Sequence, residues 1–423
     1  MKDMVRRNYH WVIATVVLLQ LFVHGGAGNN IAAYHVIPVT QALGISRIAF
    51  SFTGSIGSAV GIVSTLISGW LLQRFGYRKM AALGMLLAGA AYALLANTQS
   101  YWMLIAGRVL VGLSSGVCSV AGVSRVISAW FHRRRGMVLG AVTAATGIGS
   151  SILGLAQAWI IENSSWRGSF SLVGALMLLA AVLIYLLVRC TPEEMGLSPY
   201  GEGQTDTKKR AMRNGEMWPG FPMEYLRRRP AFYLMALCVL LCCICVYMTQ
   251  FIVVPYFQDQ GMSAIRAGRL YSIMMLLLSG TKLLAGSLSD AMGAKKVTIG
   301  CLGICAVSLV LLMLGGTGPA AVAAIVLYAF CMPLTTVMIP LLAIELFGYY
   351  AQGQYIGVFV AMASAASMIA SPCADAVFGI FGSYRPVFWG VAVAAFVTLG
   401  LELLLYRLVA RDASVLSRDK SSF

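Results

Sequence analysis

Apolar runs long enough to cross a membrane follow one another along almost the whole chain. A transmembrane α-helix needs about 20 apolar residues to cross a hydrocarbon core of roughly 30 Å, and such windows recur twelve times. The predicted spans are residues 10–36, 48–72, 80–97, 102–129, 136–160, 168–189, 231–256, 266–289, 297–315, 319–345, 354–380 and 385–406. Short polar turns separate them, so the pattern predicts an all-α membrane protein with twelve transmembrane helices.

The composition agrees with this prediction and excludes a soluble fold. Hydrophobic residues make up 59% of the chain and charged residues 11%, whereas a soluble domain has about 25% charged residues. The 10 cysteines lie in predicted helices or at a helix end, where thiols pack as small apolar groups. Because no histidine or carboxylate lies among the crowded cysteines of the seventh span, we expect no metal site and no cofactor.

The net charge of +16 is explained by topology. If the amino terminus is cytoplasmic, 23 of the 31 Lys and Arg residues fall on the cytoplasmic side and five on the opposite side. This is the positive-inside distribution, and it predicts a multi-pass protein of the plasma or inner cell membrane with both termini cytoplasmic. The partners of this charge are then anionic lipid headgroups, and no nucleic acid is expected.

One polar segment divides the chain. Residues 191–229 are weakly patterned and leave six spans on either side. We therefore predict an amino-terminal six-helix bundle at residues 1–190, a cytoplasmic linker at 191–229, and a carboxyl-terminal six-helix bundle at 230–423.

An internal repeat agrees with this division. Residues 69–79 (GWLLQRFGYRK) and 286–296 (GSLSDAMGAKK) share four of eleven positions at an offset of 217 residues. Gly136 and Gly140 match Gly353 and Gly357 at the same offset. With six spans each, the two halves have the same orientation and form parallel repeats.

Lys282 is the charge that most needs an explanation. It lies eight residues before Asp290, which is about 12 Å of helix above the charged turn. A lysine at such depth costs roughly 2.5–3.5 kcal/mol on insertion scales. We therefore expect Lys282 to face protein, water or an anion, and not lipid.

Helix one carries the polar residues Asn29, Asn30 and Tyr34 beside three glycines in four positions. Such glycines loosen a helix or let a neighbouring helix approach closely. The asparagines either form hydrogen bonds between helices or line a cavity, and both interpretations stand. For His24 we expect a satisfied hydrogen bond, as is usual for a lone histidine.

Three other spans carry polar or helix-breaking residues. In helix four, Arg108, Gly112 and Gly116 recur every four residues, which places a charge and two close-packing positions on one face. Pro333 and Pro340 predict kinks in helix ten that free backbone carbonyls. Glu402, close to the predicted inner face, is expected to reach the membrane surface as a snorkelling charge.

These segments resemble the major facilitator superfamily. The two repeated turns are similar to its helix 2–3 and 8–9 signature, Gly-x-x-x-Asp-Arg-x-Gly-Arg-Lys. Residues 130–140 (WFHRRRGMVLG), 251–261 (FIVVPYFQDQG) and 382–388 (GSYRPVF) resemble segments of the oxalate/formate antiporter and monocarboxylate transporter families. Lys282, with Gly286 four residues later, occupies the place of their carboxylate-binding cation in helix eight, which is usually Arg.

The chain departs from these patterns in three places. Gln73 replaces the Asp of the first turn, so one charge contact between the two bundles is in doubt. Asp375 stands where these families have a small residue, and Gly379 stands where they have Asp. Helix five lacks the Gly-Pro pair of the drug-antiporter signature.

The resemblance implies two six-helix bundles packed face to face around a substrate site, with transport by rocking of one bundle against the other. Lys282 then binds the carboxylate of a small organic anion, or forms a salt bridge with Asp375, or does both in turn when Asp375 is protonated. The other substrate-binding candidates are Asn29, Asn30, Tyr34, Tyr247 and Gln250. The proton-coupling candidates are Asp375 and Arg108, and the gating turns contain Gly69, Gly76, Arg78, Asp290 and Gly293.

The expected function is therefore secondary active transport of a monocarboxylate or an oxalate- or formate-like anion by a monomer. Protons or a counter-anion and the lipid bilayer are its other partners. A membrane enzyme is disfavoured because His, Cys and carboxylates never cluster at catalytic spacing. The alternative is a drug or hydrophobic-cation/proton antiporter of the same superfamily, which would use a buried acid as its anchor.

Overall fold

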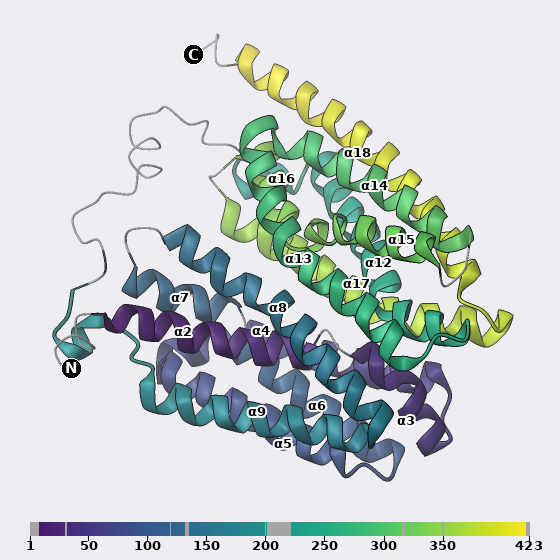
Figure 1. Ribbon diagram of the computed structural model, residues 1–423. Coiled ribbons are helices and arrows are strands. Elements are labelled where there is room, and N and C mark those ends of the chain that lie inside the picture. Colours follow the sequence, from purple (N-terminus) through teal and green to yellow (C-terminus); the bar gives the residue numbers. More distant parts are fainter. Residues whose placement is uncertain are drawn as a thin grey trace. The chain divides into compact units, whose positions relative to one another are not determined.

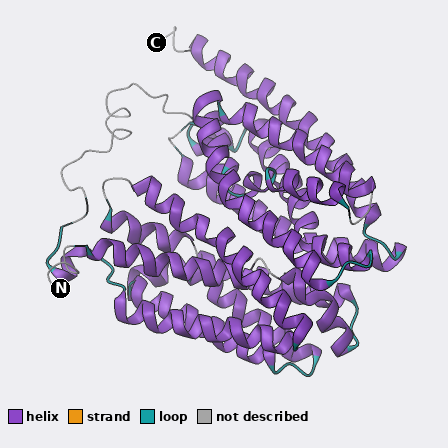
Figure 2. Cartoon of the chain, viewed as in Figure 1, coloured by secondary structure: helices purple, strands orange, loops and turns teal. Residues whose placement is uncertain are grey.

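The computed structural model describes residues 8–29, 32–118, 120–131, 135–198, 200, 221–314, 318–348 and 351–419. These residues are almost entirely helical (Figures 1 and 2). Eleven helices among them are long and apolar enough to cross a membrane, and one bent pair of helices supplies a twelfth span. The predicted all-α membrane protein is confirmed.

Each predicted span overlaps one observed span. The first half contains α2 (Tyr9–Leu21) with η1 (Phe22–Asn29), η2 (Ala32–His35) and α3 (Val36–Leu43), then α4 (Arg47–Phe75), α5 (Tyr77–Ala96), α6 (Tyr101–Val117) with α7 (Val120–Trp130), α8 (Arg135–Asn163) and α9 (Trp166–Leu187). The second half contains α12 (Pro230–Asp259), α13 (Ala264–Met292), α14 (Ala294–Leu314), α15 (Pro319–Ala329) with η4 (Met332–Thr335) and α16 (Met338–Phe347), α17 (Gln352–Phe381) and α18 (Arg385–Asp419).

The chain forms two compact units. Unit 1 comprises Met1–Asp206 with Phe251–Gly280, and unit 2 comprises Thr207–Gln250 with Thr281–Phe423. In unit 1, α5 packs against α6 and α9, and in unit 2, α14 packs against α15 and α18. Helices α12 and α13 are each divided between the units: the end of α12 and the start of α13 belong to unit 1, and the remainder of both belongs to unit 2. The predicted linker at 191–229 stays a prediction, because residues 201–220 lie outside the described chain.

Helix one is irregular at its glycines. After α2 the chain continues as the π-helix η1, and the 3₁₀-helix η2 precedes α3. A Cβ added at Gly26 would lie 2.8 Å from the Gly149 Cα atom of α8, so the glycines permit contact between two backbones. The Gly26 and Gly28 carbonyls accept hydrogen bonds from the hydroxyls of Ser150 at 3.2 Å and Tyr92 at 2.7 Å. Side chains thus satisfy carbonyls that a regular helix would use internally.

Helix ten is broken next to Pro333, one of the two prolines predicted to kink it, whereas Pro340 lies within α16. The α15–η4 segment and α16 are bent by 49°, and Pro333 lies at the start of η4. Proline cannot donate a backbone hydrogen bond and fixes its own φ, which accounts for the position of the break.

The two repeated turns share one backbone feature. Gly76 ends α4 with φ 77°, and Gly293 lies between α13 and α14 with φ 89°. Residues with a Cβ rarely adopt positive φ, whereas glycine adopts it freely. The internal repeat of the sequence therefore corresponds to a repeated turn conformation.

Candidate functional site

Two other helices, α12 and α13, form hydrogen bonds with helix ten close to its break. Tyr247 of α12 forms a side-chain hydrogen bond with Thr335 of η4. Thr281 of α13 donates to the Ala329 carbonyl at 3.0 Å, and Tyr328 of α15 donates to the Val246 carbonyl of α12. All these residues belong to unit 2. Breaks of this kind expose backbone groups inside membrane transporters and are frequent at their binding sites.

Lys282 follows Thr281 directly on α13, so it lies beside the hydrogen bond that Thr281 donates to helix ten near its break. Its side chain is half-buried, and it forms no ion pair with any described residue. An ammonium group inside a membrane protein is expensive unless water or an anion compensates it. Lys282 is thus a cation that the described protein leaves available for an anion.

Tyr247 and Gln250 lie three residues apart on the same face of α12. Gln250 is 5% exposed, and Tyr247 is half-buried. Unit 2 therefore contains three of the predicted substrate-binding residues, one on α13 and two on α12. Each is on a helix that contacts the helix-ten break.

Tyr34 belongs to unit 1 and is engaged in a contact between helices. Its hydroxyl donates to the Gly268 carbonyl at 3.0 Å and lies 3.2 Å from the Ser272 hydroxyl. Tyr34 thus ties η2 to the first half of α13. Asn30 and the side chain of Asn29 lie outside the described residues, so their predicted role stays a prediction.

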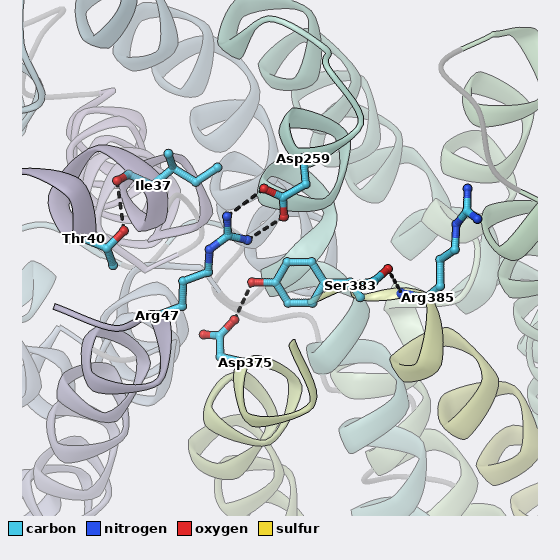
Figure 3. A network of polar contacts seen from close by, with 8 residues as sticks. Ile37, Thr40, Arg47, Asp259, Asp375, Ser383 and Arg385 are labelled. Atoms are coloured by element: carbon cyan, nitrogen blue, oxygen red, sulfur yellow. Dashed lines mark hydrogen bonds and ion pairs between the residues drawn. The ribbon is translucent and has the colours of Figure 1, made fainter. Parts of the chain in front are cut away.

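Asp375 is buried in α17 with an exposed fraction of 2%. The Tyr384 hydroxyl donates to its Oδ1 atom at 2.6 Å (Figure 3), and Tyr384 is itself fully buried. The structure does not pair Asp375 with Lys282. Arg385, the cation at the helix-eleven mouth, is exposed. The sequence alone did not reveal Tyr384 as a partner of Asp375, although Tyr384 lies within the GSYRPVF segment that resembles the transporter families.

An ion pair that the sequence did not reveal joins α4 to α12 within unit 1. The Arg47 guanidinium contacts both carboxylate oxygens of Asp259 at 2.6 and 2.7 Å (Figure 3). In the same unit, the Glu162 carboxylate at the end of α8 accepts a hydrogen bond from the Ile265 amide at 2.8 Å. A carboxylate at a helix amino terminus is favourable because unpaired N–H groups point towards it. We call the end of unit 1 that carries Arg47, Glu162 and Asp259 the Arg47 end.

Close packing between α8 and α13 extends along unit 1 from these polar contacts. The Ser279 hydroxyl donates to the Ala144 carbonyl at 2.9 Å. A Cβ added at Gly268 would lie 2.9 Å from the Ala158 Cβ atom. An added Cβ at Gly147 of α8 would likewise lie 2.7 Å from the Met275 carbonyl oxygen. The small residues of α8 therefore permit tight contact with α13.

The two predicted gating turns are anchored differently. Arg78 Nε donates to the Tyr185 carbonyl of α9 at 2.7 Å, and its guanidinium lies 4.9 Å from the Tyr185 ring centroid. In the second turn Asp290 is exposed, and Glu345 of α16 accepts hydrogen bonds from the Ala294 and Lys295 amides at the start of α14. Gly69 lies within α4.

The expectation for Glu402 is wrong. Its exposed fraction is 3%, and it accepts a hydrogen bond from Tyr406 at 3.2 Å. Helix α18 continues to Asp419, so Glu402 lies well inside the helix rather than at its end. Cys238, Cys242 and Cys301 are close enough to interact with it electrostatically. Among the described residues no group of His, Cys, Asp or Glu could hold a metal ion.

Comparison with known proteins identifies one family along the chain. The Major Facilitator Superfamily matches residues 16–348 and 247–422. The uncharacterized MFS-type transporter YcxA of Bacillus subtilis is 26% identical over 68% of this chain and 67% of its own length. Monocarboxylate transporter 9 of Mus musculus is 27% identical over 40% of the chain and 34% of its own length. The probable galactarate/D-glucarate transporter GudP of Bacillus subtilis is 26% identical over 60% of the chain and 58% of its length.

Solved structures show the same fold at low identity. A bacterial homolog of the human lysosomal transporter Spinster, in an inward-facing and unoccupied conformation, has a TM-score of 0.71 and 15% identity. The aligned part covers 96% of this chain and 98% of the homolog. A mutant of the nucleoside transporter NupG has a TM-score of 0.73 and 10% identity, with coverage of 94% and 100%.

Proposed function

This chain belongs to the Major Facilitator Superfamily, and we propose that it transports a small organic anion by alternating access. The family is one of multi-pass membrane transporters of small molecules, not of enzymes. The proposed substrate is a monocarboxylate or an oxalate- or formate-like anion. The proposed mechanism is secondary active transport, in which the substrate site opens to either side of the membrane in turn.

The observation that carries this proposal is Lys282. It is a cation in the middle of a membrane span, it has no ion pair with a described residue, and it adjoins the helix-ten break. A compact ammonium attracts a carboxylate strongly once water is excluded. Tyr247 and Gln250, on the helix that contacts the same break, supply groups that can donate hydrogen bonds to substrate oxygens.

The names of two relatives also support a carboxylate substrate. Monocarboxylate transporter 9 and the probable galactarate/D-glucarate transporter are named for molecules that carry carboxylate groups. This chain spans about a third of the first relative and 58% of the second. The support is therefore for a chemical class of substrate and not for a particular molecule.

We propose proton coupling through Asp375. A carboxylate buried in a membrane span either pairs with a cation or takes up a proton. If Asp375 approaches Lys282 in another state of the cycle, protonation of Asp375 would free the lysine for the substrate. Anion and proton would then move together.

We also propose a membrane orientation and an assembly state for this protein. The positive-inside distribution supports cytoplasmic termini in a plasma or inner cell membrane, and the Arg47 end would then face outwards. We propose a monomer made of two six-helix bundles joined by a linker at 191–229. The turns around Arg78, Asp290 and the glycines Gly69, Gly76 and Gly293 would lie at the cytoplasmic gate.

One observation favours the alternative, a drug or hydrophobic-cation/proton antiporter. Unit 2 buries two carboxylates, Asp375 and Glu402, and a buried acid could hold a cationic substrate. Each of the two already accepts a hydrogen bond from a tyrosine, which leaves less capacity for a bound cation. Lys282, in contrast, has no hydrogen-bond or ion-pair partner among the described residues.

Ligand-induced thermal stabilisation distinguishes the two functions. Ligands that bind only the folded state raise the unfolding midpoint, and the rise grows with the logarithm of ligand concentration above the dissociation constant. We expect purified protein to be stabilised by lactate, formate or oxalate and not by lipophilic cations at equal ionic strength. Stabilisation by the cations alone would favour the antiporter.

A further inference from the structure

A second buried cation has no counter-charge in the described protein. Arg108 of α6 has an exposed fraction of 8%, and its Nε atom is buried without a hydrogen-bond partner. No described residue accepts a hydrogen bond from its guanidinium or forms an ion pair with it. Buried charges in proteins are normally paired and hydrogen-bonded, because an unpaired one is strongly unfavourable.

The sequence explains why no partner is available nearby. Between Asp3 and Glu162 the chain contains no Asp or Glu, so the first five spans hold no carboxylate. At the Arg47 end, Glu162 binds the Ile265 amide and Asp259 binds Arg47. The first five spans therefore offer Arg108 neither a counter-charge nor a carboxyl group with which to exchange a proton.

The surroundings of Arg108 hold it in place without neutralising it. A Cβ added at Gly57 would lie 2.8 Å from the Arg108 carbonyl oxygen, so α4 and α6 are packed backbone to backbone at this level. The guanidinium carbon lies 5.4 Å from the Phe50 ring centroid, which gives a cation–π contact. The Tyr92 hydroxyl is also within electrostatic range, but its proton is already donated to the Gly28 carbonyl.

We propose that Arg108 binds a small anion from solution inside unit 1. The planar guanidinium offers paired N–H groups that match the two oxygens of a carboxylate, so the preferred ligand is a carboxylate group. An inorganic anion such as chloride has the same charge and is the second source to test. The inference rests on the proposed function only in naming carboxylates as ligands, because it places this site on a residue other than Lys282.

The test removes the proposed substrate anchor first. Purified Lys282→Gln protein is titrated with formate, oxalate, lactate or chloride at constant ionic strength, and its unfolding midpoint is measured. We expect at least one anion to raise the midpoint by roughly 2 °C or more at a concentration far above its dissociation constant. This shift should disappear in Lys282→Gln/Arg108→Gln and remain in Lys282→Gln/Arg125→Gln. Arg125 is an exposed arginine on α7, which makes it the matched control.

A lysine variant keeps the test decisive if Arg108→Gln does not fold. Lysine retains the charge but cannot bind a carboxylate with a planar fork, so Lys282→Gln/Arg108→Lys should need several-fold more carboxylate for the same midpoint shift. An equal response of the Arg108 variants and the Lys282→Gln parent, or no anion response in that parent, would overturn the inference. A response to chloride but not to carboxylates would support the site and assign it to an inorganic anion.

Failure of the proposed function gives a different result. If Lys282 has no part in substrate binding, wild-type and Lys282→Gln proteins will bind each anion equally, whatever Arg108 does. If Arg108 binds no anion, the Lys282→Gln protein and its two Arg108 double variants will show the same midpoint shift, whatever the difference between wild type and Lys282→Gln. The two proposals can therefore fail independently.

Discussion

The Arg47 guanidinium binds both carboxylate oxygens of Asp259, with N–O distances of 2.6 and 2.7 Å. The two residues lie 212 positions apart in the chain, at the start of α4 and the end of α12. Their side chains are 18% and 29% exposed, so solvent weakens the pair without abolishing it. The geometry is the bidentate one that gives arginine pairs their specificity.

Loss of this ion pair should loosen the Arg47 end of unit 1. A partly exposed pair is worth up to about 1 kcal/mol, so Asp259→Asn should raise the open population at this end by up to roughly fivefold. Hydrogen exchange of the amides at the end of α12 and the start of α13 measures this change. The double variant Arg47→Asp/Asp259→Arg should restore protection from exchange. Equal exchange in Asp259→Asn and wild type would show that the ion pair does not stabilise the Arg47 end.

The buried Asp375 should be needed for proton coupling. In proteoliposomes with an inward proton gradient, we expect faster anion uptake by the wild type and no such stimulation in Asp375→Asn. The reason is that the amide keeps the shape of the carboxyl group but cannot take up a proton. Stimulation that persists unchanged in Asp375→Asn would leave Asp375 with a structural role only.

Removal of the Tyr384 hydroxyl should destabilise unit 2. Tyr384→Phe deletes one donor to a buried carboxylate, and a hydrogen bond to a charged group is worth about 1.5–3 kcal/mol. We expect a lower unfolding midpoint for Tyr384→Phe than for wild type. In the matched variant Asp375→Asn/Tyr384→Phe the additional loss should be smaller, because the amide carries no charge. Equal losses in both backgrounds would show that the two side chains are not coupled.

The turn glycine Gly293 should not tolerate a side chain. An alanine at its φ of 89° costs about 1–2 kcal/mol because the Cβ atom meets the backbone. Gly300→Ala is the control, since Gly300 lies in α14 with nothing within 4 Å of an added Cβ. Thermal unfolding should therefore show a loss for Gly293→Ala and none for Gly300→Ala. Equal midpoints for the two variants would contradict the strain argument.

The sequence was most informative where local chemistry determines structure. The spans follow from apolar length alone, and the break in helix ten follows from Pro333, which cannot continue a regular helix. The irregular first helix follows from its run of glycines, and the repeated turns from Gly76 and Gly293. Each of these features depends on residues that are neighbours in the chain.

Pairings between distant residues could not be predicted in this way. Arg47 and Asp259, or Glu345 and the Ala294 amide, meet only because of how each helix is rotated about its axis. Tertiary packing sets that rotation, and no motif in a single sequence encodes it. The error over Glu402 has the same origin, since packing buries the face of α18 that carries it.

Lys282 is the residue on which the account depends most, and uptake by proteoliposomes tests it most directly. Labelled formate, oxalate and lactate are offered to the wild type and to Lys282→Gln, with Arg125→Gln as a charge-matched control. We expect uptake of at least one anion by the wild type and the control, loss of that uptake in Lys282→Gln, and partial retention in Lys282→Arg, which keeps the charge but changes its shape. Full uptake by Lys282→Gln protein would contradict the proposed anchor.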